Sequence, residues 1–102
     1  KHAELVSTID LDSAYDSFVS QKLDALAGLR PRLLEDVQKL PGARLLEGQF
    51  SAVQQAIGTA RTNEEGARFT RAFVEEAKRD GLVASLIEKH HVRGLTVAPP
   101  AP

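Results

Sequence analysis

A short apolar segment, a glycine and a proline-led stretch follow one another in the first third of the chain, and they constrain the fold more than any other feature. Residues 23–27 read Leu-Asp-Ala-Leu-Ala, which is short and apolar enough for a buried strand. Gly28 follows, and Pro31 stands where the first turn of a helix accepts a residue without an N–H. In open α/β sheets, loops of this kind at the carboxyl end of a strand bind ligands. The segment therefore predicts a strand, a ligand-facing loop and a helix.

The flanking segments predict the same alternation. Residues 4–9 and 43–46 are short apolar runs that predict two further strands. Residues 11–19 carry apolar side chains at helical spacing, and Asp10 or Asp12 offers an N-cap for that helix. Strands and helices that alternate with short loops favour a parallel βαβαβ unit with right-handed crossovers. The expected fold class is therefore α/β.

The second half of the chain has a different pattern. Residues 50–57 predict an extended return strand, and apolar spacing beyond Asn63 is helical. Thr62 or Asn63 offers an N-cap, Gly81 predicts a break, and the proline-rich tail of residues 92–102 predicts an extended end. The return strand is therefore followed by C-terminal helices. The side chains expected on the buried face of the longer helix are Phe69, Ala72, Phe73 and Ala77.

Composition excludes several classes of protein. The 102 residues include 13 basic and 14 acidic side chains, and this balance argues against a dedicated surface for nucleic acid. The sequence has no cysteine, so it forms no disulfide and no cysteine zinc site. No apolar run approaches the ~20 residues of a membrane-spanning helix. The chain begins without methionine or a signal peptide, and we expect a preceding segment to have been removed.

The polar residues form no catalytic or metal-binding pattern. His90 and His91 are adjacent, whereas two metal ligands on one helix favour a spacing of four residues, and His2 lies at the other end of the sequence. The serines lie in no nucleophile motif, and no glycine-rich phosphate loop is present. The mixed-sign run of residues 75–80 is typical of a solvated helix face. We therefore expect a protein that is not an enzyme and binds neither metal nor cofactor.

Six stretches stand in a suggestive order and spacing along nearly the whole chain. They are Lys22–Ala27, Arg30-Pro31 with Leu33-Leu34, Leu46–Gly48, Val53–Gly58, Arg71–Lys78 and Val92–Pro100. In these stretches the chain resembles the C-terminal half of a bacterial extracellular solute-binding protein of the type II periplasmic kind, similar to the family 3 amino-acid binders.

The resemblance implies two α/β lobes that capture a small polar solute between them. Residues 1–46 would be the later part of the second lobe, and residues 47–53 a hinge crossing. Residues 54–102 would form a strand and helices that pack on the first lobe, most of which this chain lacks. The hinge candidates are Glu47, Gly48 and Gln49.

The function implied by the resemblance is solute capture for an ABC-type importer in the periplasm. The expected partners are the solute, the membrane permease of the transporter, and either the missing lobe or a second copy of the chain. Because a solute site between lobes needs both walls, the chain alone is not expected to bind solute. The alternative is a small self-contained α/β domain that oligomerises or binds another protein, and a small enzyme is the third hypothesis.

The loop before Pro31 supplies the ligand-binding candidates Gly28, Leu29 and Arg30. Amino-acid binders of the resembled family place a carboxylate just before the proline-led helix, where this chain has Leu29. An aliphatic side chain cannot pair with an ammonium group, and leaving that charge unpaired in a cleft is costly. Arg30 can bind a carboxylate or phosphate, although a solvated turn residue is the alternative interpretation. The loop therefore predicts an anionic or neutral solute.

Overall fold

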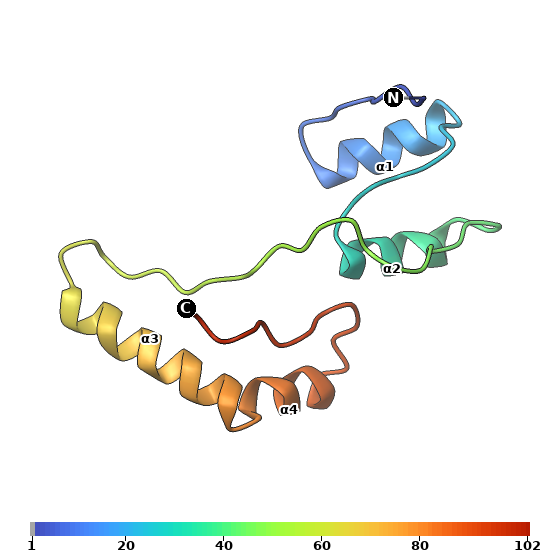
Figure 1. Cartoon of the computed structure of the whole chain (residues 1–102). Coiled ribbons are helices and arrows are strands. Elements are labelled where there is room, and N and C mark those ends of the chain that lie inside the picture. The colour runs from blue at the N-terminus through green and yellow to red at the C-terminus, as the bar shows by residue number, and fades with distance from the viewer. Residues whose placement is uncertain (1) are drawn as a thin grey trace. The chain divides into compact units, whose positions relative to one another are not determined.

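The computed structural model describes residues 2–102, and these residues contain four α-helices and no strand (Figure 1). The helices are α1 (Leu11–Ser20), α2 (Arg30–Lys39), α3 (Glu64–Arg79) and α4 (Leu82–Lys89). The chain divides into two compact units that meet between Leu45 and Leu46, so that α1 and α2 belong to the first unit and α3 and α4 to the second. The sequence predicts a boundary after Leu46, and the assignment of the parts on either side of it to two lobes stays a prediction.

The α/β fold expected from the sequence is wrong for the described residues. None of the four segments that were expected to pair, 4–9, 23–27, 43–46 and 50–57, forms a strand. A strand exists only when its N–H and C=O groups bond to a neighbouring strand, and these short segments find no such neighbour. The parallel βαβαβ unit, the return strand and the α/β type II periplasmic binding fold are therefore not formed, whereas the helices between them are.

Helix α1 begins at Leu11 because Asp10 caps it. The extended backbone of Asp10 places its Oδ1 2.7 Å from the Ser13 nitrogen, whose N–H would otherwise lack a partner in the first turn. This hydrogen bond is the main cause that lowers the pKa of the Asp10 carboxyl. Ala14, Tyr15 and Phe18 are half-buried on one face, as their spacing predicts.

Helix α2 begins next to Pro31, which confirms the start predicted from the sequence. Leu29 is the N-cap residue and makes no side-chain capping bond, so the fixed φ of Pro31 is the main local signal for this end. The helix ends at Lys39, two residues before Pro41. Gly42 then adopts a φ of +86°, a left-handed conformation that glycine reaches without a Cβ clash.

Helix α3 is the longest described helix, and both of its ends carry favourable side chains. The Asn63 side-chain oxygen accepts the Gly66 N–H at 2.8 Å, so Asn63 is the N-cap. Acidic residues occupy the first turn and basic residues the last, which complements the helix dipole. Gly81, at φ +83°, ends α3 and caps α4, and the break predicted there is confirmed. The two helices pack against each other.

Few side chains are withdrawn from water. Among the described residues only Ala77 and Asp36 are buried, with 7% and 5% of their surface exposed. The chain exposes 9182 Å². One compact domain of this mass would expose about 5,700 Å², and two separately folded halves about 6,800 Å². The surplus shows that neither unit closes a hydrophobic core of ordinary size.

The N-cap of α3 gives a direct test of its local stabilisation. Asn63→Ala removes the oxygen that accepts the Gly66 N–H, and we expect this change to lower the stability of α3 by about 1 kcal/mol. Thermal melting followed by circular dichroism at the helical band measures the loss. Thr62→Ala is the control, because Thr62 was the other cap candidate and is not the N-cap. Equal losses for the two variants would contradict the assigned cap.

The Asp10 cap predicts that α1 loses stability in acid. Because the folded-state pKa of the Asp10 carboxyl lies below its ordinary value, the ionised carboxylate stabilises α1 at pH values above that ordinary pKa. The contribution is lost as the pH falls through the folded-state pKa. The Ser13 amide resonance, followed by NMR during an acid titration, should report this loss. Asp10→Asn keeps an oxygen acceptor and should remove this titration, whereas Asp16→Asn, on the exposed side of α1, should preserve it.

Candidate functional site

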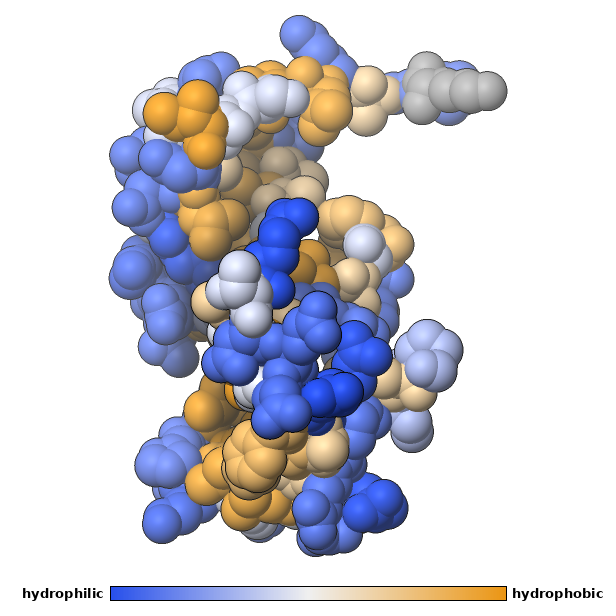
Figure 2. Space-filling model, turned by 90° about the vertical axis from the view of Figure 1, so that its left-hand side faces the viewer, coloured by the Kyte–Doolittle hydropathy of each residue, from blue (hydrophilic) through white to orange (hydrophobic). Residues whose placement is uncertain are grey.

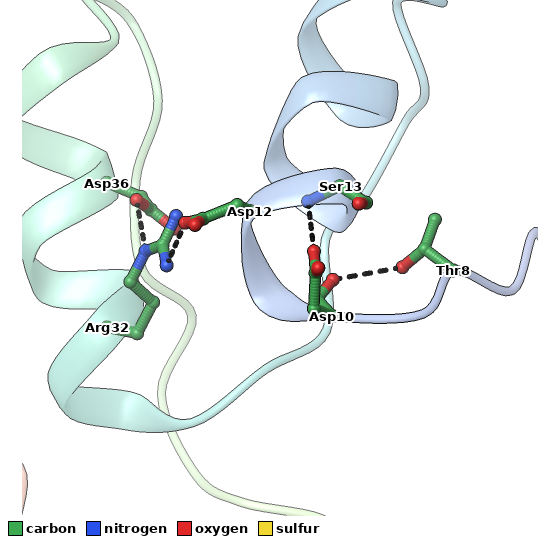
Figure 3. A network of polar contacts seen from close by, with 6 residues as sticks. All are labelled: Thr8, Asp10, Asp12, Ser13, Arg32 and Asp36. Atoms are coloured by element: carbon green, nitrogen blue, oxygen red, sulfur yellow. Dashed lines mark hydrogen bonds and ion pairs between the residues drawn. The ribbon is translucent and has the colours of Figure 1, made fainter.

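The best-formed polar cluster of the first unit joins α1 to α2 through Arg32 (Figure 3). Arg32 Nε lies 2.9 Å from Asp36 Oδ1, one turn along α2, and Arg32 Nη1 lies 2.7 Å from Asp12 Oδ1 in the first turn of α1. The hydrogen bonds with Asp36 and then Asp12 raise the pKa of the Arg32 guanidinium. Two carboxylates thus neutralise one cation, and the cluster is a structural tie between the helices.

The two carboxylates of this cluster differ in their access to water. The Asp36 side chain is 7% exposed, and the Asp12 side chain is 83% exposed. A buried carboxylate depends on its cation, whereas an exposed one is solvated whether or not it is paired. Most of the stabilisation from this cluster therefore comes from the contact between Arg32 and Asp36.

Substitution of each carboxylate tests this difference. We expect Asp36→Asn to lower the melting temperature of the first unit clearly, because it removes the buried carboxylate that neutralises the partly buried Arg32 guanidinium. Asp12→Asn should lower it by much less, since exposed ion pairs contribute about 0–1 kcal/mol. Circular dichroism melts of the two variants measure both effects. A larger loss for Asp12→Asn would contradict the assignment.

The predicted ligand loop lies at the start of α2, but no strand precedes it. Leu29 is the N-cap residue and is 42% exposed, and Arg30 is the first residue of the helix and is half-buried. A Cβ on Gly28 would lie 3.4 Å from Leu33 Cδ2, so the glycine lies within van der Waals distance of that side chain. Arg30 is already engaged in an interaction within the structure. The ligand-binding role of the three residues stays a prediction.

The predicted hinge residues lie at the start of the second unit. Glu47, Gly48 and Gln49 are exposed and belong to no helix. Gly48 has a φ of +83°, which makes glycine the suitable residue for this bend. The bend is a local feature of the backbone, and its role as a hinge stays a prediction.

The histidines are not gathered with other metal-ligating side chains. His90 is the C-cap residue of α4, and His91 follows it with a φ of +52°. In the part of the chain that the structure describes, no group of three or more His, Cys, Asp or Glu side chains is arranged to hold a metal ion.

The most prominent surface feature of the second unit is apolar. Phe69 and Phe73 of α3 stack on each other, with ring centroids 6.4 Å apart, and remain 73% and 51% exposed. Leu82 and Leu86 follow on α4, and each is 44% exposed. We call these four residues the apolar strip. Figure 2 shows hydrophobic residues at the surface in patches bordered by hydrophilic ones.

A small hollow connects the two halves of the apolar strip. Its volume is about 160 Å³, and its lining residues are Phe73, Glu76, Ala77, Asp80 and Leu82. Apolar side chains form the floor, and the carboxylates of Glu76 and Asp80 supply negative charge beside it. The hollow has room for an apolar side chain, and the charges favour a neighbouring basic group.

The helix that carries the apolar strip was predicted correctly, but the prediction that its apolar face is buried was wrong. Phe69, Ala72, Phe73 and Ala77 were expected to be buried together, and of these only Ala77 is. The spacing of the phenylalanines shows correctly that they share a face. Periodicity identifies an apolar face without showing whether the same chain covers it.

Comparison with the known protein families, with characterised proteins and with solved structures finds no match to this chain. None of the described helices has the length and apolar character needed to cross a membrane.

Proposed function

We propose that the chain is a non-enzymatic binding component whose exposed helical faces are completed by another polypeptide. The observation that carries the proposal is the surplus of exposed surface, roughly 2,400 Å² above that of two compact halves. Exposed contiguous apolar patches mark interaction surfaces in soluble proteins. Because each Å² of apolar surface removed from water contributes about 25 cal/mol, the apolar strip has a strong tendency to be covered.

For the biological role of this component, we propose solute capture for an ABC-type importer. The support is the order of the six stretches that resemble solute-binding proteins. Four of them, residues 46–48, 53–58, 71–78 and 92–100, lie in the unit that carries the apolar strip. In this role the partner polypeptide supplies the remainder of the solute site. Arg30 is the candidate contact for an anionic solute, and bending at residues 47–53 would let the solute favour a closed state.

A second candidate is self-association, in which another copy of the chain covers the strip. The observation that favours it is the stacked pair Phe69 and Phe73, because an exposed aromatic surface can pair with itself across a two-fold axis. The two candidates share the surface but differ in the occupant. A dilution series of the pure chain therefore separates them.

The test removes the aromatic part of the strip. We expect Phe69→Ser with Phe73→Ser to reduce binding of the apolar dye ANS to the second unit by roughly half or more, because these two exposed rings form the stacked aromatic pair of the apolar strip. Arg71→Ser is the matched control, as an exposed polar position on the same helix. Circular dichroism checks that α3 persists in both variants. Unchanged dye binding in the double variant would overturn the assigned surface.

Sedimentation and calorimetry identify the occupant. If another polypeptide covers the apolar strip, sedimentation should show the pure chain as a monomer from micromolar to submillimolar concentration. Dimers that form as the concentration rises, and that the double variant abolishes, would establish self-association instead. Titration with succinate, as a probe for anionic solutes, should give no binding heat with this chain alone. Micromolar affinity for succinate would contradict the need for a partner.

A further inference from the structure

The C-terminal tail returns to α3 and makes specific contacts with it. Figure 1 shows the tail, in red, turning back beyond α4 and running alongside the helices of its unit. Three of its last four residues are proline, so Ala101 has the one backbone N–H of residues 99–102. Proline-rich chain is already extended before it binds, and little conformational freedom is lost when it docks.

Two charged side chains of α3 hold this backbone. Lys78 Nζ donates to the carbonyl oxygen of Pro99 at 2.8 Å, and the Ala101 N–H donates to Glu75 Oε2 at 3.1 Å. Both hydrogen bonds involve an ionised partner and are stronger than bonds between neutral groups. The Ala101 N–H and the Pro99 carbonyl, two residues apart, are thus bound by Glu75 and Lys78.

The recognising pair is organised within α3 itself. Glu75 and Lys78 are one turn apart, and Glu75 Oε1 lies 2.6 Å from Lys78 Nζ. Their side chains are 31% and 13% exposed, so they are shielded more than the ion pair of Arg68 with Glu65 in the same helix, at 74% and 91%. The hydrogen bond from Lys78, and then that from Ala101, lowers the pKa of the Glu75 carboxyl. The ion pair therefore holds the Glu75 and Lys78 side chains in the orientation in which they bind the tail.

The tail does not pack closely against α3 along its whole length. A hollow of about 340 Å³ remains between helix and tail, and its lining residues are Glu75, Lys78, Arg79, Val97, Ala98 and Pro100. The tail therefore lies in an open groove and is held mainly at its backbone. A ligand held in this way can be exchanged for another segment with the same backbone pattern.

We propose that Glu75 and Lys78 form a binding site for an extended proline-rich peptide of the pattern Pro-Pro-X-Pro, and that the chain's own tail is its resident ligand. X is any residue that supplies an N–H, because the hydrogen bond to Glu75 comes from the backbone of Ala101. The site is separate from the apolar strip and independent of the proposed importer role.

The first experiment follows the amide resonance of Ala101 in the full-length ¹⁵N-labelled chain. We expect Glu75→Ala and Lys78→Ala each to shift it toward its position in the free peptide of residues 95–102. Arg71→Ala, also on α3 but exposed, should leave it in place. Alanine favours helix at all three positions, so α3 is retained. An Ala101 resonance that already matches the free peptide in the unaltered chain would overturn the proposal.

The second experiment tests recognition of a separate peptide. The Ala101→Pro variant of the chain lacks the N–H that the tail donates to Glu75, so its own tail binds the site more weakly. This matters because a tethered tail competes with added peptide at millimolar effective concentration. Added peptide of residues 95–102 should shift the α3 amides of this variant. A peptide with Ala101→Ser should bind equally well, and one with Ala101→Pro roughly tenfold more weakly. No binding of the unaltered peptide, or equal binding of the serine and proline peptides, would overturn the proposal.

Discussion

The described helices depend on hydrogen bonds at their own ends, because few of their side chains are withdrawn from water. Asp10 and Asn63 each satisfy an N–H of the first turn, and Pro31 replaces such an N–H at the start of α2. Isolated helices of 8 to 16 residues, as here, are marginal in water unless they are stabilised in this way or packed. Local chemistry therefore defines where helices form, while packing adds less than in a domain with a closed core.

Polar contacts between elements take on part of the role that apolar packing has in larger domains. In the first unit Arg32 links α2 to α1, and in the second unit Glu75 and Lys78 link α3 to the tail. Such contacts are directional, so they fix which segments meet. They bury little apolar surface, which is why the apolar strip remains available to another molecule.

The features that the sequence predicted correctly are those decided within a few residues. Pro31, Asn63 and Gly81 mark helix ends through their own backbone or side-chain chemistry, and each does so in the structure. The strands were predicted wrongly because a strand requires a partner elsewhere, and an apolar run such as residues 23–27 does not specify one. The tail site was missed for a similar reason, since Glu75 and Lys78 looked like solvated charges and their partners lie 26 and 21 residues further along the chain.

Residues 46–60 begin the second unit as a continuously exposed segment with no helix or strand, directly after the last residue of the first unit. Extended, solvated backbone of this kind fits the active site of a protease, which binds its substrate as an open chain. Basic residues at Arg44 and Arg61 flank the segment, and both are exposed. Trypsin acting there would leave α1 with α2 on one product and α3 with α4 on the other. Proteolysis would therefore separate the two halves of this chain without cutting through any of its helices.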